Sequence, residues 1–397
     1  MIKISHLLLF LSCMLSTNST KPQQQSADTF SWARVAELPV VNGADKSFGV
    51  AGAFAGISNN VLIVAGGANF PEGMPWMGGR KVYHDEIYVL ERNPNGQYAW
   101  LNSITSRLKN KLAYGASVSI PDGIVCIGGE NESGFSDEVF LIKWNTNQKN
   151  IVFRSLPNLP IALANACATH IGNCIYVSGG EDADRALDNF FALDLDDLHP
   201  QWKSLPAVPL AMSNSVAISL PDDKGPCIYI VGGRSKTLSG ISKLHNTVFR
   251  YEPVNKRWKR LAPISDGKHT INLSAGTGFA IDENKILLTG GDRGDIFNRL
   301  EKLNVDIAKS VSDRKRRFLE GEKLKILSQH PGFSRVLLMY NSLTDSWSKL
   351  GELPFPAQVT TMGVKWDDDM VIPSGEIQPG IRTPYIILGK IISRPSS

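Results

Sequence analysis

One pattern recurs six times along this 397-residue chain and constrains its fold more than any other feature. Each copy has a polar turn, then an apolar strand, then a glycine pair or the remnant of one. The copies lie 62, 51, 53, 58 and 84 residues apart and end at Gly67, Gly129, Gly180, Gly233, Gly291 and Gly375. Because one such unit cannot bury both faces of its sheet, the six must pack side by side, and a closed ring leaves no face uncovered.

A second signal completes each unit: an aromatic residue near the outer strand, followed by leucine or another apolar residue and often proline. The six aromatic residues are Trp32, Trp100, Phe153, Trp202, Trp258 and Trp347. Between the two signals, segments such as 85–90, 247–251 and 335–340 alternate apolar with polar residues, which is typical of half-buried antiparallel strands. A period of about 50 residues with these marks is typical of Kelch repeats. We therefore predict an all-β fold, a six-bladed Kelch-type β-propeller.

The two ends of the repeat array predict how the ring closes. The last unit supplies three strands, near 357–366, 369–375 and 383–391. Its fourth strand, with the expected tryptophan, is matched by residues 30–37. Pairing of these segments would cover an edge that otherwise stays exposed. The propeller is thus expected to span residues 30–391.

The longest interval contains an insertion at 293–334 with helix-like composition. Its apolar residues recur at spacings of three and four, as in amphipathic helices. We expect a helical insertion between the second and third strands of the last blade region, or just after the second, covering one mouth of the ring as a lid. Its basic run at 314–317 is better explained as a solvated helix face than as a nucleic-acid patch. The formal charge of +4 likewise gives no global sign of a nucleic-acid or anionic-membrane partner.

The first 20 residues read as an export signal. Lys3 precedes an apolar run at 7–11 that is too short for a lasting membrane span, and polar residues follow. Cys13 ends the apolar run in a context that loosely resembles a lipoprotein cleavage site, so both simple cleavage and lipidation stay open. We expect a periplasmic or otherwise exported protein, with membrane contact only through a lipid on Cys13.

The other cysteines lie in apolar, strand-like stretches and not in Cys-x-x-Cys or histidine-adjacent spacings. They are Cys126, Cys167, Cys174 and Cys227. Although export permits disulfides, these residues are better explained as small buried apolar side chains. No metal site is predicted.

The residue after each glycine pair is expected near one axial mouth, where a propeller gathers one loop from every blade into a polar pocket. These residues are Ala68, Glu130, Glu181, Arg234, Asp292 and Glu376. Several acids around one opening suit proton transfer on a polar ligand. An acid in this position can equally accept backbone hydrogen bonds, and its repetition favours such a scaffold role for Glu130, Glu181 and Asp292.

The last unit has a carboxylate and a guanidinium on the two sides of a turn. Glu376 and Arg382 flank Pro379-Gly380, and a Pro-Gly bend can bring its two flanks together. An arginine fork suits a ligand carboxylate, and the glutamate could move a proton beside it. From spacing alone, a structural ion pair explains the same two residues.

Five segments carry a resemblance to a known family. They are 49–73 (GVAGAFAGISNNVLIVAGGANFPEG), 80–90, 112–130, 291–304 and 374–383 (SGEIQPGIRT). With these segments the chain resembles the N-acetylneuraminate epimerases, also called sialic acid mutarotases. The blade order is rotated relative to better-known members, which a ring tolerates because neighbours in space are unchanged.

The resemblance implies an isomerase that interconverts the α and β anomers of N-acetylneuraminate without a cofactor. By motif, Glu376 corresponds to the proton acceptor and Arg382 to the pocket arginine, which would hold the C1 carboxylate of the sugar. The secondary candidates for ligand contact are Asn69, Arg80, Lys81 and Glu130. For the first three, plain surface or loop roles stay open.

Two other functions compete with this one. A non-catalytic propeller that binds a glycan or protein partner has the same fold, because propellers host many functions. A copper-radical oxidase of the galactose oxidase type is disfavoured, because the seven histidines form no ligand cluster with tyrosine and a reactive cysteine. The exact sugar, the oligomeric state and the acid that protonates the ring oxygen stay open.

Overall fold

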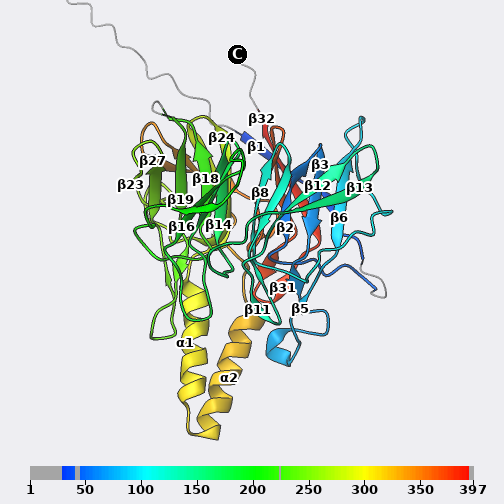
Figure 1. The fold of residues 1–397 in the computed structure, drawn as a ribbon. Helices are drawn as coiled ribbons and strands as arrows, with labels where there is room; N and C mark the ends of the chain where they lie inside the picture. The colour runs from blue at the N-terminus through cyan, green and yellow to red at the C-terminus, as the bar shows by residue number, and fades with distance from the viewer. Residues whose placement is uncertain (1–28, 41–44, 223–224, 393–397) are drawn as a thin grey trace, which may run out of the picture.

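The computed structural model describes residues 29–40, 45–222 and 225–392 of the chain. These residues form six four-stranded antiparallel sheets packed side by side as the blades of a propeller, with two helices projecting from one end (Figure 1). The predicted six-bladed, mainly β propeller with a helical insertion is therefore confirmed.

Five blades are continuous in sequence, and each runs from an inner to an outer strand. They are β2 (Phe54–Ser58), β3 (Val61–Ala65), β6 (Ile87–Arg92) and β7 (Tyr98–Trp100); β8 (Ala116–Ile120), β9 (Gly123–Ile127), β12 (Val139–Asn145) and β13 (Asn150–Ser155); β14 (Cys167–Ile171), β15 (Cys174–Ser178), β16 (Phe190–Asp194) and β17 (Trp202–Ser204); β18 (Val216–Leu220), β19 (Cys227–Val231), β22 (Val248–Glu252) and β23 (Arg257–Arg260); β24 (Ser274–Asp282), β25 (Lys285–Asp292), β26 (Val336–Asn341) and β27 (Ser346–Glu352).

The sixth blade closes the ring with strands from both ends of the propeller. It contains β28 (Val364–Trp366), β29 (Asp369–Pro373), β32 (Tyr385–Ile392) and β1 (Thr29–Glu37). β1 pairs antiparallel with β32 in a register that places Trp32 opposite Gly389. The N-terminal strand thus supplies the outer strand of the last blade, as the sequence predicted.

A closed circle of backbone hydrogen bonds joins the blades around the axis. One residue of each blade, just before or at the start of its inner strand, adopts a left-handed conformation with φ between 52° and 67°. Each of these N–H groups donates to the carbonyl of its equivalent in a neighbouring blade, at 2.7–3.1 Å. The six residues are Gly52, Tyr114, Asn165, Asn214, Ala275 and Thr360. The Gly52 N–H donates to Thr360 and completes the circle between first and last blades.

The core lies between the blades. One buried apolar cluster fills each of the six gaps between neighbouring sheets of the described chain. At the outer edge, Trp100, Trp202, Trp258 and Trp347 each donate an indole N–H to a backbone carbonyl of the preceding blade. These tryptophans therefore fasten adjacent blades by hydrogen bonds as well as by apolar contact.

Short hairpins extend four blades beyond their second strands at one mouth of the ring. They pair β4 (Ala68–Asn69) with β5 (Val82–Tyr83), β10 (Glu130–Asn131) with β11 (Gly134–Phe135), β20 (Arg234–Ser235) with β21 (Lys243–Leu244), and β30 (Glu376–Gln378) with β31 (Ile381–Arg382). A short 3₁₀ helix, η1 (Pro75–Met77), lies in the loop between β4 and β5.

In the blade next to the closing one, the same position holds the helical insertion. α1 (Asp295–Lys309) and α2 (Asp313–Ser328) connect the second and third strands of that blade, β25 and β26. The two helices pack on each other and project from the mouth where β5, β11 and β31 lie (Figure 1). The insertion thus replaces the small hairpin of the other blades.

The described cysteines are not disulfide-bonded. Cys126, Cys167 and Cys227 are buried in the sheets, and Cys174 is half-buried. Burial raises the pKa of the Cys167 thiol to about 12, which makes it a poor nucleophile. Cys13 and the expected signal at 1–20 lie outside the described residues. Among the described helices, none has the length and apolar character needed to cross a membrane.

Candidate functional site

The residues that follow the glycine pairs surround one cavity of about 410 Å³, at the mouth that carries the small hairpins and the helices. Five of the six predicted residues line it, whereas Ala68 is fully buried elsewhere. Lining residues from the glycine positions are Glu130, Glu181, Arg234, Asp292 and Glu376. The sequence therefore located the mouth correctly.

The glycine pairs create this arrangement by allowing the chain to turn close to the next blade. Gly179 has φ +63°, and a Cβ built there would lie 2.2 Å from the carbonyl oxygen of Met212. Only glycine tolerates both conditions. After this turn, Glu181 forms an antiparallel β-bridge with Ala164, which precedes the inner strand of the same blade.

Glu376 and Arg382 are direct neighbours in the closing blade. They face each other in the register of β30 and β31, around the Pro379-Gly380 turn. The Gly380 N–H donates to Glu376 Oε1 at 2.6 Å, and Arg382 Nη1 lies 3.5 Å from the same oxygen. The Pro-Gly turn therefore brings the Glu376 carboxylate and the Arg382 guanidinium together, as expected from the sequence.

The environment of Glu376 favours its protonated form. Burial raises the pKa of this carboxyl, against the Arg382 charge and the Gly380 N–H, which lower it. The charge of Asp292 raises the pKa of Glu376 further. A carboxyl group with a raised pKa is a better proton acceptor once it is ionised, so Glu376 has the properties of a general base.

Arg382 lies behind the cavity wall and does not line it. Its side chain is 5% exposed and its guanidinium stacks over Phe70 at 4.7 Å. Nη2 lies 3.5 Å from the Tyr114 hydroxyl, and Nε and Nη1 have no hydrogen-bond partner among the described residues. Its charge therefore acts on the cavity through Glu376 and Tyr114, which do line it.

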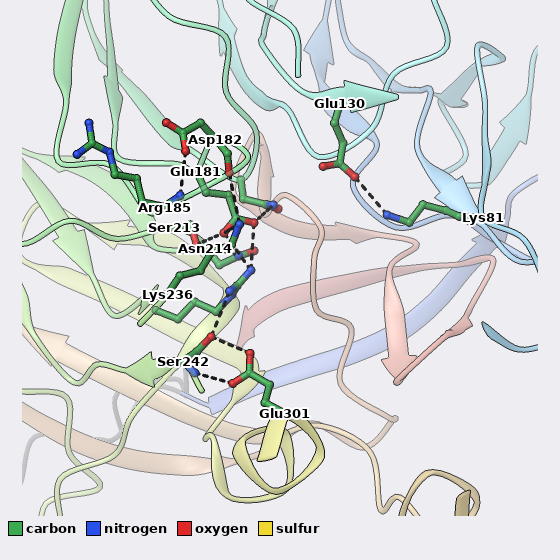
Figure 2. A network of polar contacts seen from close by, with 12 residues as sticks. Lys81, Glu130, Glu181, Asp182, Arg185, Ser213, Asn214, Lys236, Ser242 and Glu301 are labelled. Carbon is green, nitrogen blue, oxygen red and sulfur yellow. Dashed lines mark hydrogen bonds and ion pairs between the residues drawn. The ribbon is translucent and has the colours of Figure 1, made fainter. Parts of the chain in front are cut away.

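Lys81 places a positive charge on the cavity wall. Its Nζ lies 3.2 Å from Glu130 Oε1, an ion pair drawn in Figure 2. The ammonium group also lies over the rings of Tyr83 and Tyr114. Burial lowers the pKa of Lys81, but the surrounding Tyr114 and Glu130 outweigh it and raise it to about 12. Lys81 is therefore a permanent cation beside the opening.

A polar network on the other side of the cavity holds the helical insertion (Figure 2). Glu181 accepts hydrogen bonds from Arg234, Asn165 and Ser213. Ser242 joins the network to α1, because its N–H and hydroxyl donate to the Glu301 carboxylate at 2.6 and 2.8 Å. Glu181 is saturated with donors, which supports the scaffold role considered for it.

Asp292 has fewer partners. Its Oδ1 accepts the Gly294 N–H at 2.7 Å, at the start of the insertion. Burial raises the pKa of Asp292, partly offset by that hydrogen bond, and the charges of Asp295 and Glu301 add to the rise. The cavity thus contains two carboxyl groups with raised pKa values, Asp292 and Glu376.

Asn69 and Arg80, two of the predicted contact residues, do not line the cavity. Asn69 is buried, and its amide donates to the Gly49 carbonyl at 2.9 Å and lies 2.8 Å from His84 Nε2. Arg80 is exposed. Of the predicted site residues, Lys81, Glu130 and Glu376 line the cavity, whereas Asn69, Arg80 and Arg382 do not.

Several lining residues were not predicted. Tyr114, Asn165 and Asn214 occupy equivalent positions of the axial circle, a signal that superposing the six repeats would have given. The insertion adds four more, for which no repeat offers a comparison: Phe297, Leu300, His330 and Phe333. Among the described residues, no group of three or more His, Cys, Asp or Glu is placed to hold a metal ion.

Comparisons with known proteins show the family to which the chain belongs. A family model described as N-acetylneuraminate epimerase matches residues 11–151 and 156–395. An N-acetylneuraminate epimerase of Haemophilus influenzae (strain 86-028NP) is 28% identical over 248 residues, covering 61% of this chain and 60% of the relative. One from Salmonella typhimurium (strain LT2) is 28% identical over 242 residues, 58% of this chain and 57% of the relative. These matches thus span about three fifths of the relatives' length. By the family model, which covers nearly the whole chain, this protein belongs to the N-acetylneuraminate epimerase family.

Proposed function

We propose that this protein is a cofactor-independent mutarotase that interconverts the α and β anomers of N-acetylneuraminate, outside the cytoplasm. The observation that carries the proposal is the pair of partly buried carboxyl groups, Glu376 and Asp292, on one cavity of a propeller of this family. Two carboxyl groups with raised pKa values suit a reaction that needs one proton removed and another donated.

Glu376 is the base in this mechanism. It removes the proton from the anomeric hydroxyl, the C2=O bond forms, and the bond between C2 and the ring oxygen breaks. Asp292 in its protonated form gives its proton to that ring oxygen. The open-chain 2-keto form turns the other face of its carbonyl toward the ring hydroxyl and recloses by the same steps in reverse. No electrons leave the sugar, so no cofactor is required.

In this mechanism Lys81 holds the C1 carboxylate of the sugar. Lys81 lies on the wall and can contact it directly, whereas Arg382 lies behind Glu376 and limits the rise of its pKa. Positioning by these charges places the anomeric centre next to the glutamate. General acid–base help of this kind supplies a factor on the order of 10²–10⁴.

The proposal is tested by following freshly released α-N-acetylneuraminate by proton NMR. We expect the protein to speed the decay of the α signals to the equilibrium mixture, and Asp292→Asn to slow that decay by about tenfold or more. Decay no faster than in buffer, together with saturable binding of the sugar, would instead support the competing function, a glycan-binding propeller.

A further inference from the structure

The helical insertion adds to the cavity a wall unlike that of the ring. The blades contribute mainly charged and polar groups, whereas the insertion contributes Phe297 and Leu300 from α1 and Phe333 from the segment after α2. Leu244, on β21, extends this apolar surface. The cavity is therefore polar on the side of the blades and apolar on the side of the insertion.

One polar side chain lies within the apolar wall. His330 is 5% exposed, and its ring packs on Phe333 with the ring centroids 5.6 Å apart. Its Nδ1 accepts the Gly332 N–H at 3.0 Å, so the neutral ring carries its proton on Nε2. Burial lowers the pKa of His330 and favours that neutral form. Nε2–H has no hydrogen-bond partner in the part of the chain that the structure describes. A neutral N–H donor that is surrounded by apolar groups suits a neutral acceptor, such as an amide carbonyl.

Hydrogen bonds from the blades fix this wall at two points, one on α1 and one after α2. Glu301 on α1 accepts two hydrogen bonds from Ser242 of the fourth blade (Figure 2). After α2, the Gln378 side chain donates to the His330 carbonyl at 2.6 Å, from the strand that carries Glu376. The position of His330 relative to Glu376, the proposed base, is therefore fixed.

We infer that the insertion wall is the subsite for the acetamido group of the substrate. The methyl group packs against Phe297 and Phe333, and the amide carbonyl accepts the hydrogen bond from His330 Nε2–H. This inference rests on the proposed mutarotase function. It assigns His330, Phe297 and Phe333 as specificity-determining residues for a sugar acid that carries an N-acyl group.

Two substrates test the inference: N-acetylneuraminate and the deaminated nonulosonic acid that has a hydroxyl in place of the acetamido group. We expect anomer exchange with kcat/KM about 10–200-fold higher for the acetamido sugar. Phe297→Ala and His330→Phe should each reduce this ratio several-fold, and Phe318→Ala, on the exposed face of α2, should leave it unchanged. Equal kcat/KM for the two sugars, or a ratio that the two variants do not alter, overturns the subsite.

A binding measurement separates failure of the subsite from failure of the proposed function. In saturation-transfer NMR with N-acetylneuraminate, we expect the acetamido methyl protons to receive the strongest saturation, and Phe297→Ala to weaken it. If exchange is not accelerated but this pattern holds, the mutarotase proposal is wrong and the subsite stands. If the methyl protons receive no more saturation than the rest of the sugar, the subsite is wrong whatever the catalytic result.

Discussion

Arg382 Nη1 lies 3.5 Å from Glu376 Oε1, on the opposite strand of a hairpin whose turn also donates a backbone N–H to that oxygen. The guanidinium is almost fully buried, so its charge is poorly screened by water. Its main effect is on the proton affinity of Glu376, which burial raises and Arg382 limits. The pair therefore sets the pH at which the proposed base becomes ionised.

The first prediction concerns the pH dependence of catalysis. Because Glu376 must be ionised to accept a proton, kcat/KM should fall as the pH drops below its pKa, at a pH above that of an ordinary glutamate. Arg382→Gln removes the charge that lowers this pKa, so the acidic limb should move to higher pH. Arg382→Lys retains a charge and should shift the limb less. Identical limbs in all three proteins would show that Arg382 does not tune the base.

The second prediction concerns stability. A carboxyl whose pKa is raised on folding contributes stability that is fully present below the unfolded pKa and is lost as the pH rises through the folded pKa. Above its pKa in the folded protein, the ionised Glu376 is therefore a cost to the folded state. Glu376→Gln should have a Tm at pH 7 equal to or above that of the wild type, and this advantage should shrink toward pH 4. A clear loss of Tm at pH 7 would mean that the ion pair with Arg382 is a net stabilising contact.

The third prediction concerns ring closure. A Cβ added at Gly389 would lie 2.4 Å from the Trp32 ring, across the pair of strands that closes the propeller. Gly389→Ala should lower the free energy of unfolding by about 1–3 kcal/mol through overpacking. The smaller side chain of Trp32→Leu in the same protein should recover part of this loss in denaturant unfolding.

A matched glycine substitution provides the control for that experiment. Gly321 lies within α2 and has open space where a Cβ would be. Gly321→Ala should stabilise its helix by about 0.5–1 kcal/mol. If both alanine substitutions have the same small effect, the contact between Trp32 and Gly389 does not restrain the closing strands.

The fourth prediction concerns the attachment of the insertion. Glu301→Ala removes both hydrogen bonds from Ser242, so the base of α1 should loosen and the apolar wall of the cavity should lose its fixed position. We expect faster amide exchange in residues 295–309 and a KM raised several-fold, with kcat affected less. Glu322→Ala breaks only an exposed pair with Arg299 and should change neither measurement.

The repeat pattern was sufficient to predict the propeller and its closure. Each blade has the same physical requirements, so a signal that is weak in one copy can be recognised from the other five. Only residues 30–37 were left to complete the last sheet. The mouth was predictable for the same reason, because five of the six residues that follow the glycine pairs line it. The expected grouping of Glu130, Asp292 and Glu376 around one opening is therefore confirmed by the cavity that they line.

The parts that escaped prediction depend on side-chain direction or occur once. Spacing brings the backbones of Glu376 and Arg382 together, but it does not reveal that the guanidinium turns away from the cavity toward Phe70. Asn69 follows a glycine pair closely, yet its amide is used by the Gly49 carbonyl. His330 follows a helix in an insertion with no counterpart in the other blades, so no repeat marked it as a lining residue.

The most direct test of the mechanism compares Glu376→Gln with Glu132→Gln, an exposed acid on the β10–β11 turn of the second blade that does not line the cavity. Anomer exchange of N-acetylneuraminate at equilibrium would be measured by NMR for both variants and the wild type. We expect Glu376→Gln to lose the acceleration, a drop on the order of 10²-fold or more, and Glu132→Gln to retain it. Wild-type exchange rates in Glu376→Gln would contradict the assignment of Glu376 as the base.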